Sequence, residues 1–401
     1  MREMKDSGVR WIGKIPTKWT IAKAKNCVEI QNGSDPKTEG SIPVYGSGSM
    51  SFKTCGEYKE GPSVLIGRKG ATLHIPHYIS SKFWNVDTAF NVYSKSIFDL
   101  KYYFYCAHVF DYTLYMSQTT LPSMTQTAYE NMFLPLPTKE EQYAIANQLD
   151  QICSKIDAVL EKTRASIEEY KKLKQAVITQ VVTKGVRGDR PMKDSGSVWF
   201  EEIPCNWVMK RIKYLFHIKK DIVGKEGYTV LSITQRGIQP KDLSKNEGQI
   251  AANYSQYQLL APGDFAMNHM DLLTGWVDIS KYSGVTSPDY RVFVLDDAEK
   301  NDSSYYLYLM QMCYFNRIFY GLGQGVSGMG RWRLQADNFL NFPVVVPPVD
   351  EQKEIVSYLN EKCKQLDTLI RNKQQYLTEI ENYKKSLIYE YVTGKKEVHP
   401  L

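Results

Sequence analysis

The chain repeats itself, and this internal repeat limits its fold more than any other feature of the sequence. A first block, which begins MKDSG and ends on a tryptophan, covers residues 4–19 and recurs at residues 192–207. A second block, which begins with a Glu-Gln pair and ends with a Val-Thr pair, covers residues 141–183 and recurs at residues 351–393. Two halves with the same local sequence imply two structural units of similar fold, related by a pseudo-twofold axis.

The segments between these blocks, residues 20–136 and 208–347, resemble each other only weakly, and the second is the longer. We therefore interpret the chain as A–H–A′–H′, where A and A′ are these two segments and H and H′ are the second repeated blocks. The repeated blocks would form a common framework, and each A segment would have a function of its own. Gene duplication followed by drift would also explain the repeat. It would not explain why the divergence is confined to the A segments.

Each of the second blocks is predicted to form one long helix. Prolines precede both blocks, and in the first one Thr138 and Glu141 have the spacing of a capping box. Neither proline nor glycine follows until Gly185 in the first block and Gly394 in the second, and glycine commonly ends a helix. Helices of about 45 residues are roughly 65 Å long at ~1.5 Å per residue.

Apolar residues recur along both helices in alternating steps of three and four, which is the pattern of a coiled-coil seam. The cheapest way to bury two such stripes in one chain is to pack them against each other, and a pseudo-twofold axis makes the pair antiparallel. An intermolecular coiled coil is the alternative. The predicted seam consists of Ile145, Leu149, Ile152, Ile156, Val159, Tyr170 and Leu173 in the first helix and Val356, Leu359, Leu366, Ile370, Leu377, Ile380 and Leu387 in the second.

The A segments contain short apolar or alternating runs cut by turn residues, followed by one helical stretch. In the first segment the predicted strands lie at 42–46, 63–67 and 90–93 with a helix near 102–116, and in the second they lie at 228–233, 263–267 and 290–295 with a helix near 304–319. We predict an α+β fold with two domains of mixed, partly barrel-like sheets and helices, separated by the two long antiparallel helices. The predicted boundaries are 1–137 for the first domain, 138–185 for the first spacer helix, 186–347 for the second domain, and 348–401 for the second spacer helix and tail.

Loops of both A segments carry groups that suit contacts with nucleic acid. Arginine and lysine side chains pair with guanine, asparagine and glutamine pair with adenine, and backbone amides in glycine turns bind phosphate. Ordinary polar loops explain any single residue equally well, and only the set on two related domains favours DNA. The candidates are Arg68, Lys69, Gln118, Thr120, Gln235, Arg236, Asn268, His269, Arg331 and Arg333.

Composition narrows the compartment and the class of protein. The formal net charge is only +6, so the basic residues must be concentrated on one surface if nucleic acid is the partner. No apolar stretch approaches the roughly 20 residues of a membrane helix, and the N-terminus has no signal-peptide run. The seven cysteines include no Cys-x-x-Cys pair, which favours reduced thiols in the cytoplasm over a disulfide framework or a zinc site.

Motifs for catalysis are missing from the sequence. No phosphate-binding Gly-x-x-x-x-Gly-Lys-Ser/Thr loop is present, and no Asn/Asp-Pro-Pro-aromatic motif of amino-methyltransferases. His74 and His77 could form half of a metal site, but no third ligand is evident. We therefore predict no catalytic residues, no bound metal and no cofactor in this chain.

At this point the sequence resembles a known family. The block Trp-Ile-Gly-x-Ile-Pro-x-x-Trp at residues 11–19 and the block Pro-Leu-Pro-x-x-x-Glu-Gln at residues 135–142 resemble the entry and exit of a target-recognition domain in specificity subunits of type I restriction-modification systems. Both blocks recur, with a few departures, at 199–207 and 345–352. The resemblance covers essentially the whole chain.

The resemblance implies that each A domain reads one half of a split, asymmetric target in double-stranded DNA. The helices would act as a ruler of about 19 base pairs at ~3.4 Å per step, and they would dock two methyltransferase subunits. Those subunits would carry S-adenosylmethionine for adenine-N6 methylation, and two motor-nuclease subunits would bring ATP and Mg. The chain itself would be non-catalytic.

Two other functions are compatible with the residues alone. The chain could be a coiled-coil scaffold whose domains bind protein or glycan partners through their many tyrosines. It could also be a self-contained nuclease or methyltransferase with an unrecognised site. The sequence does not give the DNA target, the gap length, the base-contacting residues, or whether the restriction subunit accompanies the methyltransferase.

Overall fold

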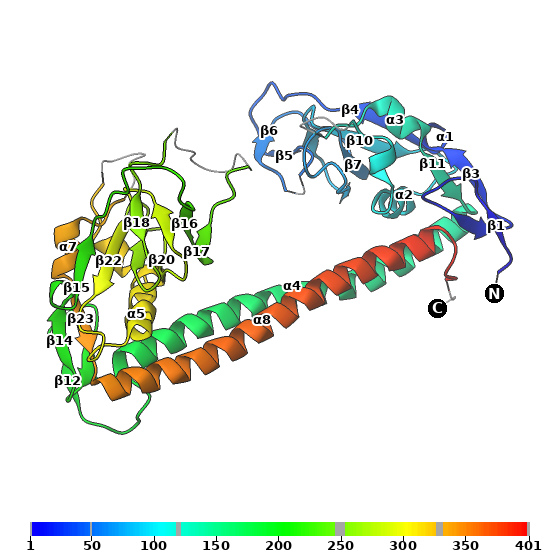
Figure 1. The fold of residues 1–401 in the computed structure, drawn as a ribbon. Helices are drawn as coiled ribbons and strands as arrows, with labels where there is room; N and C mark the ends of the chain where they lie inside the picture. The colour runs from blue at the N-terminus through cyan, green and yellow to red at the C-terminus, as the bar shows by residue number, and fades with distance from the viewer. Residues whose placement is uncertain (1, 49, 118–121, 245–252, 326–331, 399–401) are drawn as a thin grey trace. The chain divides into compact units, whose positions relative to one another are not determined.

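The computed structural model describes residues 2–48, 50–117, 122–244, 253–325 and 332–398. It divides into two compact units, one made of residues 1–165 and 373–401 and the other of residues 166–372. Each unit combines a strand-rich head with one segment from each long helix. We call residues 1–138 head 1 and residues 185–348 head 2. Figure 1 follows the chain through these elements.

The first unit follows the element order expected for a small α+β domain. In chain order it contains β1 (Met4–Asp6), β2 (Lys14–Pro16), β3 (Thr20–Lys23), α1 (Ala24–Cys27), β4 (Val28–Asn32), β5 (Ile42–Tyr45), β6 (Lys53–Cys55), β7 (Ser63–Gly67), β8 (His77–Ile79), β9 (Trp84–Asn85), β10 (Ala89–Ser94), α2 (Leu100–Ala107), η1 (Tyr112–Leu114), α3 (Gln126–Asn131), β11 (Phe133–Leu136) and the first part of α4 (Lys139–Lys184).

The second unit repeats this order with additional strands. It contains the last part of α4, β12 (Met192–Asp194), β13 (Glu202–Pro204), β14 (Val208–Arg211), η2 (Ile212–Tyr214), β15 (Phe216–Lys219), β16 (Leu231–Thr234), β17 (Gly237–Pro240), β18 (Gln258–Leu260), β19 (Phe265–Met267), β20 (Val277–Ile279), β21 (Gly284–Thr286), β22 (Arg291–Leu295), α5 (Ser303–Phe315), α6 (Ile318–Gly321), α7 (Ala336–Asn341), β23 (Pro343–Val346) and the first part of α8 (Val349–Val392).

A four-stranded antiparallel sheet forms the centre of each head. Its order is β4-β10-β7-β8 in head 1 and β15-β22-β19-β20 in head 2. Val92 of β10 and Phe293 of β22 occupy equivalent positions in these sheets. On one side each pairs with an isoleucine, in β4 or in β15, and on the other side each pairs with a residue in the first half of β7 or β19. The predicted α+β fold with an internal repeat is therefore confirmed.

Smaller sheets distinguish the two heads. Head 1 carries a three-stranded sheet of order β6-β5-β9, in which β5 and β9 run parallel. Head 2 instead carries the hairpin β16–β17 and the pair β18–β21. These small sheets are where the described parts of the two heads differ most in architecture.

The predicted helices within the heads are too long. The helix predicted near 102–116 ends at Ala107, and a short 3-10 helix follows, whose first turn is capped by Asp111 through the Thr113 N–H at 3.2 Å. The helix predicted near 304–319 is two helices, because Arg317 adopts a left-handed conformation with φ 59°. A regular spacing of apolar residues does not reveal such interruptions when the helical turns on both sides follow the same spacing.

Both long helices form as the sequence predicts. At the start of α4, Thr138 Oγ1 accepts from the Glu141 N–H at 3.3 Å while the Glu141 carboxylate accepts from the Thr138 N–H at 3.4 Å, so the capping box is present. Gly185 and Gly394 follow the two helices with φ 76° and 70°, a left-handed conformation that glycine adopts without steric cost.

Segments of the two helices pair in an antiparallel sense inside each unit. In the first unit Asp157 bonds to Lys384 at 2.6 Å and Arg164 to Glu381 at 2.5 Å. In the second unit the Lys174–Asp367 pair, at 2.7 Å, is the equivalent of Asp157–Lys384, and Arg187, in the loop after α4, bonds to Glu354 at 2.6 Å. These exposed ion pairs contribute little stability singly, and their main effect is to fix the register. The pairing is intramolecular, as predicted.

One row of the predicted seam in α4 is at least partly buried at Ile145 and Ile152 but is wrong by a single residue further along the helix. Val159 and Leu173 are exposed, whereas Leu160 and Ile167 are buried. Leu149 and Ile156 belong to the other row and lie in the interface or at its edge. Both candidate rows are apolar and adjacent on the helix, so the three-four spacing is satisfied by either one. In α8 every predicted seam residue is at least partly buried.

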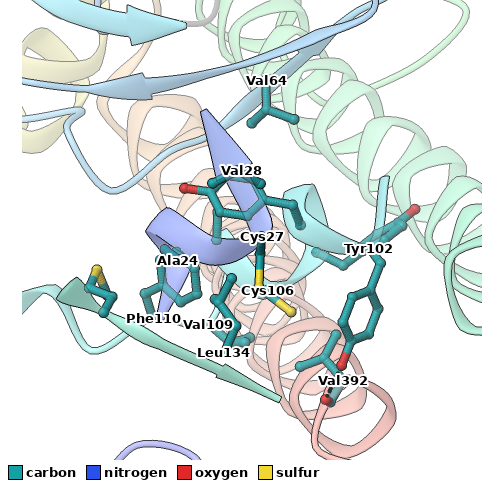
Figure 2. Close-up of a cluster of buried hydrophobic side chains, with 14 of the residues drawn as sticks. Ala24, Cys27, Val28, Val64, Tyr102, Cys106, Val109, Phe110, Leu134 and Val392 are labelled. Atoms are coloured by element: carbon teal, nitrogen blue, oxygen red, sulfur yellow. Dashed lines mark hydrogen bonds between the residues drawn. The ribbon is translucent and has the colours of Figure 1, made fainter. Parts of the chain in front are cut away.

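The repeated blocks attach each head to both long helices. At the start of one helix, the Trp19 indole donates to the Glu141 carboxylate at 3.1 Å. At the end of the other helix, the Tyr102 hydroxyl donates to the Val392 carbonyl at 2.8 Å, inside the apolar cluster that Figure 2 shows. The first head is thus fixed to the beginning of α4 and to the end of α8.

Head 2 makes the same attachments with the equivalent residues. The Trp207 indole donates to Glu351 at 2.9 Å, and the Tyr305 hydroxyl donates to the Val182 carbonyl at 3.0 Å. The glutamine after each glutamate also recurs in its role, because Gln142 and Gln352 each accept at 2.7 Å from the backbone N–H that precedes α2 or α5. Residues of the repeated sequence blocks, together with one equivalent tyrosine from each A segment, therefore join the heads to the helices.

Glu351 is a buried carboxylate that depends on its partners. It accepts from Arg190 at 2.5 Å, from Asn206 at 2.6 Å and from Trp207. Burial alone would raise the pKa of Glu351, but these hydrogen bonds together hold it below its ordinary value of 4.5. Its equivalent, Glu141, is about one-third exposed and meets Trp19 and the Arg2 guanidinium.

Removal of the two glutamates is expected to have unequal costs. Glu351→Ala should destabilise the second unit by about 3–5 kcal/mol, because it leaves the largely buried Arg190 charge uncompensated, whereas Glu141→Ala should cost the first unit about 1 kcal/mol. Because the folded pKa of Glu351 is depressed, its contribution is present above pH 4.5 and is lost as the pH falls through the folded pKa. Hydrogen–deuterium exchange of peptides from 199–215 and 11–27 reads the two units separately. Equal loss of protection in both variants would contradict this account.

Candidate nucleic-acid interface

The candidate cations of head 1 directly follow the second inner strand of its sheet. Arg68 and Lys69 come after β7, and the Arg68 N–H bonds to the Thr88 carbonyl at 2.8 Å. The Arg68 guanidinium lies over the Phe90 ring at 5.7 Å, and the Lys69 ammonium meets Asp87 at 3.4 Å. Both side chains are partly exposed. Neighbouring residues hold both side chains in place, but both stay accessible to a ligand.

A second candidate loop of head 1 lies against the first. The Met124 N–H bonds to the Arg68 carbonyl at 2.9 Å, and Ser117 and Ser123 pair across the base of a hairpin. Lys69 forms a backbone bridge to Ser123. Ser123 and Met124 therefore lie beside Arg68 and Lys69. The candidates Gln118 and Thr120 lie outside the described part of the chain.

Head 2 brings its candidates together at the equivalent place. Asn268 and His269 follow β19, and the Leu334 N–H bonds to the His269 carbonyl at 3.0 Å, as Met124 does to Arg68. The backbones of Gln324 and Arg333 pair at 2.8 and 3.0 Å. Arg333 is exposed. Its neighbour in the candidate set, Arg331, lies outside the described residues.

The remaining candidates of head 2 join the same group of loops. Gln235 and Arg236 form the exposed turn between β16 and β17. The Gln235 amide donates to the Thr274 carbonyl at 3.3 Å, in the loop that begins with Asn268. Residues that are far apart in the sequence therefore meet in one group of loops, although the sequence alone does not say so.

Asn268 has a structural role that competes with base contact. Its side-chain oxygen accepts from the Met270 N–H at 3.2 Å and from the Asp271 N–H at 3.3 Å, and this arrangement closes the turn after β19. The ordinary polar-loop interpretation is thus well supported for this residue's carbonyl oxygen.

Arg291 is a buried cation that the sequence analysis did not select. Its guanidinium donates to the Leu334 carbonyl at 2.8 Å and lies 4.9 Å from the Phe339 ring. Burial lowers the pKa of Arg291 to about 10. In the sheet it takes the place that Phe90 has in head 1. In the sequence, Arg291 is distinguished only as the single charged residue at the start of the apolar run 291–295.

Arg291 and its surroundings keep His269 neutral. Burial, followed by the charges of Arg291 and Arg333, lowers the pKa of the His269 ring to about 4. The Nδ1 atom of this ring is buried and has no hydrogen-bond partner in the described structure. At neutral pH the ring can therefore donate one hydrogen bond and accept another, but it adds no positive charge.

The described residues hold no group of three or more His, Cys, Asp or Glu side chains placed to bind a metal ion. His77 is half-buried, and burial lowers the pKa of its ring. All seven cysteines are free thiols, and six of them are buried. Among the helices of the described segments, none combines the length and the apolar character that crossing a membrane requires.

The ring of His269 is expected to titrate well below the range of ordinary histidines. Side-chain NMR should give a pKa of about 4 for His269, and Arg291→Met should move it upward because one nearby positive charge is removed. Lys300→Met, a surface change on the same unit, should not move it. Since the folded pKa lies below the unfolded value of about 6.5, protonation favours unfolding, and stability should fall as the pH drops from 6.5 towards 4. Titration of His269 near pH 6.5 would contradict this environment.

Comparison with known proteins finds a similar fold and a similar sequence. A chain in a solved structure described as the structural basis of complex assembly and conformational transition of a type I R-M system superimposes with a TM-score of 0.69, at 13% identity, over 95% of this chain and 99% of that one. The type I restriction enzyme MjaVIII specificity subunit of Methanocaldococcus jannaschii is 27% identical over 298 residues, or 71% of this chain. The alignment spans 66% of that relative, slightly under two thirds of its length.

The family profile described as the type I restriction modification DNA specificity domain matches the chain twice, at residues 16–169 and 204–382. Each match covers most of one head together with the helix that follows it, and the two matches together cover well over half of the chain. The chain therefore belongs to the family of type I restriction-modification DNA specificity proteins and carries two copies of the family's domain.

Proposed function

We propose that this chain is the DNA-recognition subunit of a type I restriction-modification complex and that it reads a bipartite, asymmetric target. One observation carries the proposal: two heads with the same sheet and the same loop anchoring present different side chains at equivalent positions. Arg68 and Lys69 stand in head 1 where His269 and the residue after it stand in head 2. The family membership supports DNA recognition, and it does not support the scaffold alternative.

The difference between the heads would make the two half-sites different. A guanidinium such as that of Arg68 can donate two hydrogen bonds to guanine, and an ammonium such as that of Lys69 suits guanine or phosphate. In head 2 the neutral ring of His269 and the exposed cation of Arg333 offer another set of donors and acceptors. An asymmetric target follows from this chemistry, because each half-site would be read by a different set.

We further propose that the chemistry belongs to partner subunits. Methyltransferase subunits would hold S-adenosylmethionine and methylate adenine at N6, and motor-nuclease subunits would hold ATP and Mg. This chain would be non-catalytic, hold no cofactor and work in the cytoplasm, where free thiols such as its seven cysteines stay reduced. The name of the Methanocaldococcus relative, a specificity subunit of a restriction enzyme, supports this division of labour.

The exposed apolar row of the long helices is the surface that suits two copies of one partner. Val159 in the first unit and Leu369 in the second stand at the same distance from their Glu-Gln pairs, and both are exposed. Leu173 and Tyr383 form the next exposed pair of equivalent residues. Exposed apolar residues at heptad spacing favour contact with another protein. Because this row repeats while the candidate DNA loops do not, it fits a pair of identical methyltransferase subunits.

The docking row can be tested by pull-down of the methyltransferase subunit. The double variant Val159→Glu and Leu369→Glu should fold normally but lose the co-purifying methyltransferase, because it places charges in both apolar contacts. Each single variant should lose about half of it. Val198→Glu, at an exposed valine outside the helices, is the matched control. Full retention by the double variant would place the partner elsewhere.

The function itself is tested by the methylome of the host. Deletion of the gene should abolish one bipartite motif with N6-methyladenine in both halves, and reintroduction of the gene should restore it. Arg68→Ala should then relax recognition of one half-site and Arg333→Ala of the other, each by roughly 10-fold, since one good base contact is worth about 1–3 kcal/mol. A methylome unchanged by deletion would refute the proposal, and loss of both half-sites in a single variant would refute the assignment of one half-site to each head.

A further inference from the structure

Two large apolar side chains stand exposed on one turn of head 1. Met50 and Phe52, in the connection between β5 and β6, are 80% and 59% exposed. Single exposed apolar residues are ordinary on protein surfaces. Two of this size on one turn, with the sheet below already filled by Val44 and Cys55, indicate a contact that is made outside the chain.

This turn lies against the loop that carries Arg68 and Lys69. The Ser47 hydroxyl is 3.3 Å from the Thr72 hydroxyl, three residues beyond Lys69. A Cβ atom on Gly46 would lie 2.8 Å from the Thr88 hydroxyl, and the Thr88 carbonyl accepts the Arg68 N–H. The absence of a side chain on Gly46 thus permits the close packing of the turn beside the candidate cations.

Charges around the turn match an anionic partner. The Lys53 ammonium lies 5.6 Å from the Phe52 ring centroid. Lys82, which precedes β9, lies 3.9 Å from the Tyr58 ring and 3.4 Å from the Glu60 carboxylate. Lysines beside exposed rings suit a polymer with phosphates outside and flat apolar bases inside. An apolar protein surface would leave the Lys53 charge beside Phe52 without a matching group.

The small sheet that holds the turn is firmly attached to the central sheet. The Lys59 ammonium donates to the Asn32 carbonyl at 3.1 Å and to the side-chain oxygens of Asn85 at 2.8 Å and Asn91 at 2.6 Å. Asn85 and Asn91 are fully buried. The Phe52 N–H bonds to the Val44 carbonyl at 3.1 Å. Because these bonds hold the turn in place, it can contact a ligand without changing its conformation.

We propose that Met50 and Phe52 form an apolar wedge that contacts the bases in the half-site read by head 1 and partly unstacks one base step, next to phosphates bound by Lys53 and Lys69. The inference rests on the proposed function and adds a shape-dependent contact to the hydrogen-bonding loops. Proteins that insert Phe or Met side chains between base pairs use this contact to read how easily a step deforms.

The test uses the full chain in complex with its methyltransferase and duplexes that carry the motif found in the methylome. 2-Aminopurine is placed singly at each position of the head 1 half-site other than the methylated adenine. One position should brighten on binding of the wild-type complex. Phe52→Ala, and separately Met50→Ala, should abolish that increase and weaken binding by roughly 5- to 100-fold. Val198→Ala, at an equally exposed valine in the other unit, should change neither reading.

The outcomes separate this inference from the function on which it rests. A wild-type fluorescence pattern and affinity in both variants, with the motif still methylated, would overturn the wedge and leave the proposed function standing. Loss of the methyltransferase from the Phe52→Ala complex would also overturn it, since the turn would then be a protein contact. Absence of any motif would overturn both.

Discussion

The structure depends on how each head holds the beginning of one long helix and the end of the other. Trp19 bonds to the first turn of α4 while Tyr102 bonds to the last turn of α8, and Trp207 and Tyr305 do the same with the helices exchanged. Each bond joins a buried aromatic side chain to a helix terminus, where backbone or capping groups otherwise lack partners. Neither helix can shift along its axis without breaking these bonds, so the register of the pair is set at both ends as well as along the seam.

This attachment explains why divergence is confined to part of each head. The residues that join a head to the helices recur in both halves, because both heads must pack against the same kind of helix termini. The loops after β7 and β19 are both anchored by backbone bonds, from Met124 and Leu334 to the carbonyls of Arg68 and His269. A backbone anchor leaves the side chain free to vary. The same frame can therefore present Arg68 in one head and His269 in the other at no cost to the fold.

Much of this architecture could be predicted from the sequence, because it rests on local signals. The capping box at Thr138 and Glu141, the terminating glycines and the repeated blocks each depend on a few neighbouring residues. The choice between Val159 and Leu160 could not be made in the same way, since it depends on which of two adjacent apolar rows meets the partner helix. Arg291 was missed for a related reason. Its significance comes from the ring of Phe339 and the carbonyl of Leu334, which are distant in sequence. The candidate loops were found residue by residue, but their meeting at equivalent ends of two sheets required the strand register.

The two sheets also indicate how the side chains offered to a ligand can change while the backbone that carries them stays the same. In head 1 a guanidinium on the loop, that of Arg68, lies over an aromatic ring on the strand, that of Phe90. In head 2 the strand position carries the guanidinium of Arg291 and the loop position carries the ring of His269. One cation and one flat ring are present in both arrangements, but the partly exposed loop residue is a charged donor in the first and a neutral ring in the second. A different pair of residues at these two positions thus alters the hydrogen-bonding groups and the charge offered to a ligand, while the strand register stays the same.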